Sequence, residues 1–176
     1  MEPPVQKMVI YGVSFDMVGK QPIVLLKTAD GNRFLPIWIG HPEAAAILMR
    51  LQAKETPRPM THDLFTDVLG TIGAEIVQIA VTDLRDNTFY ARITLRSDGS
   101  TYEIDSRPSD AIALAVRCDA PIFAADDVIE ASAIQMEDEG GGAAIEGSGD
   151  VETEIQGFRE FLENVRPEDF GGPSSS

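Results

Sequence analysis

The sequence predicts an α/β domain built from two similar halves and followed by a long acidic tail. Three observations support this fold class: runs that alternate between apolar and polar residues, an Asp-Gly turn in each half, and an alanine-rich helix after the third strand of each half. The 176 residues, 43% of them hydrophobic, suffice for one domain with a proper core. A second full domain is not expected.

The first half is predicted to contain three strands and one helix. Its strands are expected at 7–17, 22–28 and 33–39, and its helix from 41 to about 53. Asp30-Gly31 predicts a tight hairpin turn, because glycine adopts positive φ without steric cost. Pro42 suits the first turn of the helix, where its missing N–H is not needed.

A second helix is expected to follow a short connector. Thr61 is its predicted N-cap, and Gly73 stands where a C-terminal stop belongs. Its apolar residues recur at helical spacing and are predicted to form one face: Leu64, Phe65, Val68, Leu69 and Ile72.

The second half repeats the pattern of the first. The expected elements are strands at 75–82, 88–95 and 101–105, a helix from 107 to 116, a short buried strand at 121–124 and a helical turn from 126. A shift of about 67 residues places Glu43 on Asp110 and Arg50 on Arg117. Alanine-rich helices that follow strands resemble one another by chance, but the matching Asp-Gly turns favour an internal duplication.

Composition divides the rest of the chain. The predicted segments are an N-terminal extension (1–6), the domain (7–135), an acidic flexible linker (136–152), an amphipathic helix (153–166) and a disordered tail (167–176). The helix is predicted from one broad apolar face: Ile155, Phe158, Phe161, Leu162 and Val165. About three turns are marginally stable in isolation. The alternatives are docking on this domain, on a second subunit or on a partner protein, or intermittent formation with no partner.

The net charge of −15 is unevenly distributed. From Glu137 onward, 11 acidic and 2 basic residues give −9, and the rest of the chain gives −6. A basic stripe that could follow a phosphate backbone is lacking, which argues against tight sequence-independent binding to nucleic acid. It leaves open a nuclease that brings weakly bound RNA or DNA to a metal. With Cys118 as the only cysteine, no signal peptide and no membrane-spanning run, a cytoplasmic location is expected.

The first candidate site is the run from Arg58 to Asp63. His62 would act there as general base or metal ligand, Asp63 as metal ligand and Arg58 as a phosphate clamp. His62 and Asp63, which follow Thr61, fall in the first helical turn, where unpaired backbone N–H groups favour anions. The alternative is a simple helix cap with a solvated histidine, and the local pattern alone favours that alternative.

The second candidate site is the run from Asp105 to Asp110. Two carboxylates beside Arg107, at a junction between strand and helix, can hold a divalent cation and a phosphate. The alternative is a charge-balanced helix start capped by Ser106 or Ser109, which the pattern alone again favours.

Two further residues complete the candidates. Glu43 is the acid equivalent to Asp110 on the first helix. Trp38 is flanked by apolar strand residues, so it is expected to pack against the core rather than to stack on bases.

Three motifs resemble those of the bifunctional nuclease domain family. They are Leu-Pro-Ile-Trp-Ile-Gly at 35–40, Arg-Pro-x-Thr-His-Asp-Leu at 58–64 and Asp-Ser-Arg-Pro-Ser-Asp-Ala-Ile-Ala-Leu-Ala at 105–115. The resemblance covers roughly residues 7–132. It implies two β3-α units that form an α/β sandwich, and degradation of both RNA and DNA, as described for plant members. The acidic linker and the short helix look like the tails of actinobacterial relatives.

Two hypotheses follow. In the first, the protein is a nuclease in which a divalent metal (Mg²⁺ or Mn²⁺) activates water to attack a phosphodiester. In the second, it is a non-enzymatic regulatory or binding module that takes a small anion, a nucleotide or a protein partner at the same helix starts. The metal ligands would be drawn from Glu43, Asp63, Asp105 and Asp110, and the catalytic groups from Arg58, His62, Asp63 and Arg107.

Convergence of the carboxylates separates the two hypotheses, because a metal needs at least two of them within coordination distance. Self-association into a homo-oligomer is also expected, since short strands leave sheet edges to be covered.

Overall fold

The computed structural model describes residues 4–16 and 18–135. The predicted linker (136–152), C-terminal helix (153–166) and tail (167–176) lie outside the described residues.

The first half forms three antiparallel strands and a helix, as predicted. Its elements are β1 (Val5–Asp16), β2 (Gln21–Thr28), β3 (Arg33–Trp38) and α1 (His41–Leu51). β1 begins at Val5, slightly before the expected start, because its first residues pair with a strand from the far end of the domain. Pro42 lies in the first turn of α1, where the sequence placed it.

The second half repeats this arrangement after an intervening helix. Its elements are α2 (Thr61–Thr71), β4 (Ala74–Arg85), β5 (Thr88–Ser97), β6 (Ser100–Ser106), α3 (Pro108–Cys118), β7 (Ile122–Ala125), α4 (Asp126–Ser132) and β8 (Ile134–Gln135). Asp98 and Gly99 both have positive φ, 49° and 75°, which is the backbone that a two-residue hairpin turn requires. The Asp-Gly hairpin turn predicted in the second half is therefore confirmed. The expectation for Asp30-Gly31 was wrong in its reason, because Gly31 does not have positive φ and four residues, 29–32, join β2 to β3.

All eight strands join one mixed sheet in the order β6-β5-β4-β7-β1-β2-β3-β8. Each half supplies three neighbouring antiparallel strands. β7 lies between the halves, antiparallel to β1 and parallel to β4. A short strand near the end of the domain therefore joins the two halves into a single sheet.

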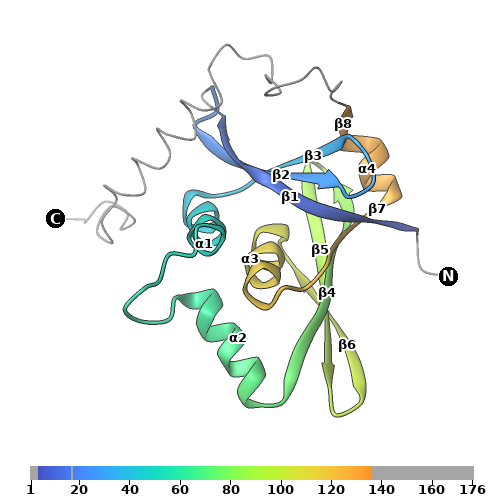
Figure 1. Ribbon diagram of the computed structural model, residues 1–176. Coiled ribbons are helices and arrows are strands. Elements are labelled where there is room, and N and C mark those ends of the chain that lie inside the picture. The colour runs from blue at the N-terminus through green and yellow to red at the C-terminus, as the bar shows by residue number, and fades with distance from the viewer. Residues whose placement is uncertain (1–3, 17, 136–176) are drawn as a thin grey trace.

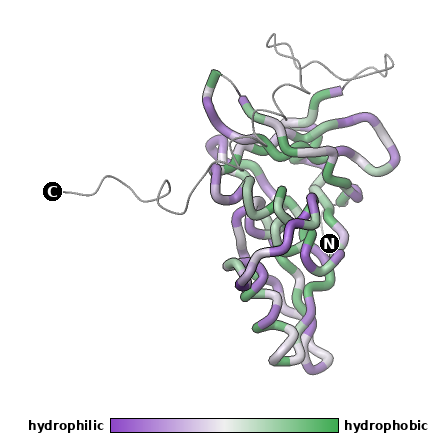
Figure 2. The backbone as a smooth tube through the Cα atoms, turned by 60° about the vertical axis from the view of Figure 1, so that its left-hand side comes forward, coloured by the Kyte–Doolittle hydropathy of each residue, from purple (hydrophilic) through white to green (hydrophobic). Residues whose placement is uncertain are grey.

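α1, α2 and α3 lie together on one face of this sheet, whereas α4 lies apart from them against β3, β4 and β7; the fold is the mixed α/β sandwich that the sequence predicts (Figure 1). α1 packs against α3, and α3 packs against both β4 and β5. Alanines make α3 thin enough for this close packing: Ala111, Ala113 and Ala115 are all buried. The hydrophobic segments gather where the strands and helices meet (Figure 2).

Three local predictions were wrong. Met60, not Thr61, is the N-cap residue of α2, and the cap is made from inside the helix by Asp63, whose Oδ2 accepts the N–H of Met60 at 2.8 Å. Arg107, not Ser106 or Ser109, is the N-cap residue of α3.

Trp38 does not pack into the core and is 50% exposed. The preceding residue, Ile37, points to the core, so strand alternation turns Trp38 to the opposite face of the sheet.

The apolar face predicted for α2 is present but mostly uncovered. Leu69 is buried, whereas Leu64, Phe65, Val68 and Ile72 are exposed. Among the described residues, no helix is long and apolar enough to cross a membrane.

Candidate functional site

Arg107 lies at the centre of a cluster of charged side chains at the start of α3. Its Nη1 donates to Glu43 Oε1 at 3.0 Å, which links α3 to the first turn of α1. Its Nε and Nη2 donate to the two oxygens of Asp110 at 2.7 and 3.1 Å. A guanidinium matches a carboxylate in this bidentate way, so its orientation is fixed by geometry as well as by charge.

The local backbone makes room for this contact. Gly40 precedes α1, and a Cβ at that position would collide with Glu43 Oε2. Pro108 follows Arg107 as the first residue of α3 and is buried, which fixes the direction in which the helix begins.

His62 enters the cluster from the first turn of α2. Its Nε2 lies 3.0 Å from Asp110 Oδ1, and its side chain is only 16% exposed. Burial raises the pKa of Asp110, but the hydrogen bonds and charges of Arg107 and His62 outweigh burial, so the pKa lies below its ordinary value. Asp110 is therefore ionised at neutral pH and can orient the imidazole of His62.

The two halves of the molecule meet at this cluster. Glu43 and Asp110, which the internal repeat pairs, both bind the guanidinium of Arg107. The cluster thus combines residues from α1, α2 and α3. Four of the residues singled out from the sequence come together here: Glu43, His62, Arg107 and Asp110.

Asp63 has a different partner. Its Oδ1 accepts Nε of Arg117 at 2.6 Å, and the Arg117 side chain is 6% exposed and also donates to Ala113 O. Burial raises the pKa of Asp63, but the Met60 N–H and Arg117 outweigh it and leave the pKa lowered. The ion pair ties α2 to the last turns of α3.

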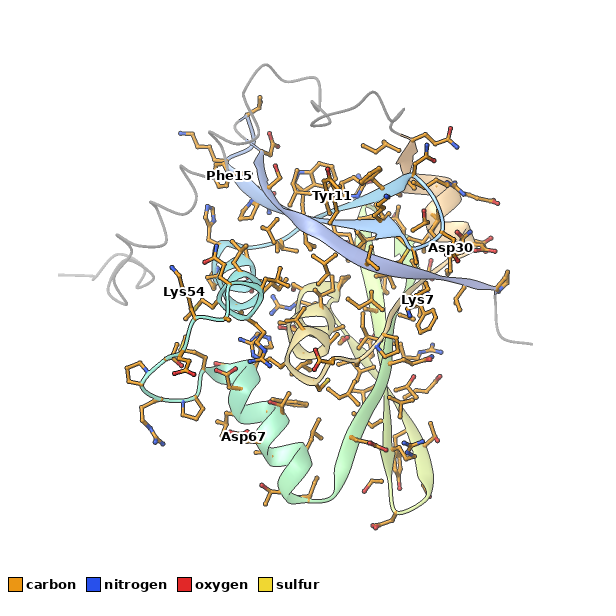
Figure 3. The ribbon with its side chains drawn as sticks, viewed as in Figure 1. Lys7, Tyr11, Phe15, Asp30, Lys54 and Asp67 are labelled. Atoms are coloured by element: carbon orange, nitrogen blue, oxygen red, sulfur yellow. The ribbon has the colours of Figure 1, made fainter. Side chains whose placement is uncertain are left out.

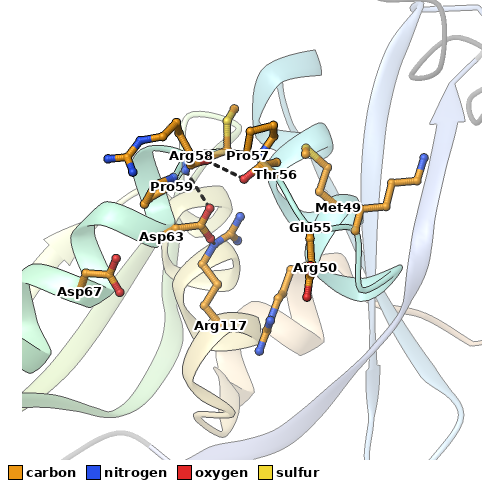
Figure 4. Close-up of a pocket in the computed structure, with 12 residues that line it drawn as sticks. Met49, Arg50, Glu55, Thr56, Pro57, Arg58, Pro59, Asp63, Asp67 and Arg117 are labelled. Atoms are coloured by element: carbon orange, nitrogen blue, oxygen red, sulfur yellow. Dashed lines mark hydrogen bonds and ion pairs between the residues drawn. The ribbon is translucent and has the colours of Figure 1, made fainter.

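Asp105 and Arg58 lie outside the cluster. Asp105 is exposed on β6, opposite Arg92 of β5. Arg58 lies in the connector between α1 and α2, on the rim of a pocket of about 310 Å³ (Figure 4). Cations are prominent in its lining, which includes Arg50, Lys54, Arg58 and Arg117.

Sequence reasoning missed Arg50, Lys54 and Arg117 as functional candidates. The internal repeat held the signal for two of them, since it aligns Arg50 with Arg117 on equivalent helices. Arg50 Nε donates to Val116 O, so both arginines lie at the packed α1–α3 boundary.

The four predicted metal ligands do not form one coordination group. Within residues 4–16 and 18–135, no three His, Cys, Asp or Glu side chains are placed to hold a metal together. Glu43 and Asp110 are the predicted ligands that share a cationic partner. The guanidinium of Arg107 lies between these two carboxylates and balances part of their charge.

Comparison with known proteins identifies the family. A family model described as "Bifunctional nuclease domain" matches residues 24–137. The chain belongs to the bifunctional nuclease domain family. The motifs around His62 and Arg107 both lie inside the matched region.

Relatives fall into two groups. An uncharacterized protein of Mycobacterium tuberculosis is 37% identical over 161 residues, which are 92% of this chain and 95% of the relative. Bifunctional nuclease 1 of Arabidopsis thaliana is 30% identical over 105 residues, 57% of this chain. Bifunctional nuclease 1 of Oryza sativa subsp. japonica is 29% identical over 103 residues, 56% of this chain. The matches span about a third of each plant protein, 32% and 31%.

Proposed function

We propose that this protein hydrolyses phosphodiester bonds of RNA and DNA at the cluster of Glu43, His62, Arg107 and Asp110. The observation that carries the proposal is the convergence of a histidine–carboxylate pair and a bidentate arginine from three helices. Membership of the bifunctional nuclease domain family supports it, as do the names of the plant relatives. The cytoplasm, with its reducing conditions, suits a chain with a single cysteine.

His62 acts as the general base in this proposal. Asp110 holds Nε2, so Nδ1 takes a proton from the attacking water. The water oxygen bonds to phosphorus and the bond from phosphorus to the leaving sugar oxygen breaks. That oxygen takes a proton from solvent water, and the proton held by His62 returns to solvent. One water is thereby divided between the two product ends.

Arg107 stabilises the charge on the phosphate. Its side chain is largely exposed, so its donors can reach a bound phosphate that approaches from solvent. The pKa of Arg107 is raised by Asp110 and by Glu43, which keeps the guanidinium charged. Fixed positive charge beside the developing negative charge lowers the barrier.

Glu43 and Asp110 would hold the divalent metal expected from the sequence. When bound, Mg²⁺ or Mn²⁺ would neutralise charge on the phosphate oxygens. We assign Asp63 instead to positioning, because its bond to Arg117 sets the place of α2 and therefore of His62.

The pocket near Arg58 would receive a neighbouring phosphate of the substrate. Arg50, Lys54 and Arg58 supply positive charge there, although Glu55 and Asp67 partly offset it. Binding is expected to be weak and to fall with salt concentration, because few phosphates are neutralised.

The test is cleavage of labelled single-stranded RNA and DNA by the full chain, with Mg²⁺, with Mn²⁺ and with EDTA. His62→Gln and Arg107→Met are each expected to lower the rate by about 10²-fold or more. Arg92→Met is the matched control, because Arg92 forms an exposed ion pair with Glu103 on the far strands and should leave the rate unchanged.

Three outcomes separate the hypotheses. Cleavage lost in both site variants and kept in Arg92→Met supports the nuclease. Cleavage that survives in the site variants places the activity elsewhere or in a contaminant. Oligonucleotide or nucleotide binding without cleavage by the unaltered chain supports the binding module instead. The two carboxylates that already bind Arg107 favour this second hypothesis.

We also propose that the chain self-associates through the exposed face of α2. Four apolar side chains are uncovered there, and large apolar patches on soluble proteins commonly mark interfaces.

A further inference from the structure

A second apolar surface lies on the face of β1, β2 and β3 opposite to the helices. Strand alternation defines it, since Val24, Leu26 and Leu35 point to the core while their neighbours point away. Strand register puts the members of this outer patch in adjacent rows: Val9, Lys27, Phe34 and Ile134; then Leu25 and Pro36; then Ile23 and Trp38. Tyr11 joins them at the irregularity in β1.

The outer patch is contiguous and partly uncovered. Ile23, Leu25 and Phe34 are buried, whereas the rings of Tyr11 and Trp38 are 56% and 50% exposed. Tyr11 meets Phe34 edge to face, with ring centroids 5.0 Å apart. Figure 3 shows Tyr11 on the side of the strands away from α1 and α3. A contiguous patch of this kind marks a docking surface more often than a scatter of single residues does.

The described chain ends at the border of this patch. Ile134 and Gln135 form β8, the edge strand next to β3, and Ile134 pairs with Phe34. Residues 136–154 separate this point from Ile155. A flexible chain of that length spans about 24 Å on average and more when extended. The predicted C-terminal helix (153–166) can therefore reach every row of the outer patch.

The chemistry of the segment fits the patch. Its apolar side chains, Ile155, Phe158, Phe161, Leu162 and Val165, fall on one face of a helix. The segment 153–166 itself carries three acidic and two basic residues, and the other eight acidic residues of the chain from Glu137 onward flank it. Lys7 and Lys27 lie on the same face as Val9, and Lys27 Nζ is 5.8 Å from the centre of the Phe34 ring. Lysines at the border of an apolar patch attract an acidic partner.

We propose that residues 153–166 fold as an amphipathic helix and dock on the outer patch of their own domain. Because the segment is tethered, its effective concentration is about 1 mM, so an intrinsic dissociation constant of about 0.1 mM gives about 90% occupancy. A segment that would bind as a separate peptide only at about 0.1 mM and above is thus held in cis. The occupant covers Tyr11 and Trp38 and leaves the cluster around Arg107 untouched.

The mycobacterial relative supports a role for the tail within this group. A match over 92% of the chain must continue past Gln135, well into residues 136–176. The matches to the plant nucleases cover only 56–58% of the chain, a length that fits within the domain.

The test uses Trp38, the only tryptophan of the chain, as its probe. Acrylamide quenching of its fluorescence is measured for the full chain and for the double variant Phe158→Ser with Phe161→Ser. Loss of docking should raise the quenching constant about two-fold. In the unaltered chain the docked segment shields Trp38 from acrylamide in most of the protein molecules, and in the double variant it does not. Ile145→Ser, which removes an isolated apolar residue of the linker, is the matched control and should change nothing. These changes lie outside the described fold, so folding does not confound them.

A peptide of residues 151–167 gives the second arm. Supplied at about 1 mM, about ten times the intrinsic dissociation constant, it should restore protection to the double variant and have little effect on the unaltered chain, whose patch is occupied. Unchanged quenching in the double variant would overturn the proposal. So would protection that disappears on dilution from about 100 μM to about 1 μM, because docking in cis does not depend on concentration whereas association with a second copy does.

Discussion

The carboxylate of Asp110 binds two partners. Arg107 donates to both of its oxygens, and His62 contacts one of them. The sequence identified all three residues as candidates, because acids and arginines at helix starts are visible in a sequence. It could not show which arginine meets which acid. The pairing of arginines with acids depends on how α1, α2 and α3 pack. Asp63, for example, binds Arg117 and not Arg107.

Stability should depend on pH through Asp110. Its folded pKa lies below the unfolded value of 3.8, so the stabilisation by the charged group is complete above pH 3.8 and is lost as pH falls through the folded pKa. Asp110→Asn should therefore lower the free energy of unfolding by about 1–2 kcal/mol at pH 7. Urea denaturation from pH 7 to pH 3 should show this difference shrinking at acidic pH. Asp105→Asn, on an exposed strand, is the control; a difference that stays constant with pH would contradict the assignment.

At the scale of elements, the turns were the easiest features to predict. Asp98-Gly99 and Gly73 have the positive φ that their sequence positions predict, whereas Gly31 of the first Asp-Gly pair does not. Edge strand β8 was missed because two residues show no periodicity. The apolar face of α2 was located correctly, but a pattern gives the face and not its partner.

Two glycines at the end of α2 should respond in opposite ways to alanine. Gly73 has φ of +75°, so Gly73→Ala should destabilise the protein by about 1 kcal/mol. Gly70 lies within the helix, and a Cβ there meets nothing within 4 Å. Gly70→Ala should therefore stabilise by about 0.5–1 kcal/mol. Thermal unfolding compares them directly, and melting temperatures that shift in the same direction would contradict this account.

At the scale of the whole molecule, the repeat predicted two three-stranded units but not how they join. β7 is only four residues long, and its sequence shows that it is buried without showing its neighbours. Pairing across more than a hundred residues is set by the global fold, which no local pattern encodes.

Self-association through α2 is testable on the full chain. Leu64→Asp combined with Val68→Asp should convert an oligomer into a monomer, because charges replace apolar contacts in the interface. Light scattering coupled to size exclusion gives the mass, and circular dichroism checks that the variant is folded. Tyr102→Asp, on the distant edge strand β6, tests whether any lost apolar group has the same effect. An unaltered chain that is monomeric at all concentrations would rule out the interface.

The position of β7 has a consequence for synthesis on the ribosome. β1 and β4 are both synthesised well before β7, the strand that pairs with both of them. Until residue 125 has left the exit tunnel, each half presents an open strand edge to the surrounding solvent. Open edges template pairing with other chains. A nascent chain that stalls before Ile122 should therefore need chaperones, whereas one released after Ala125 can close its sheet unaided.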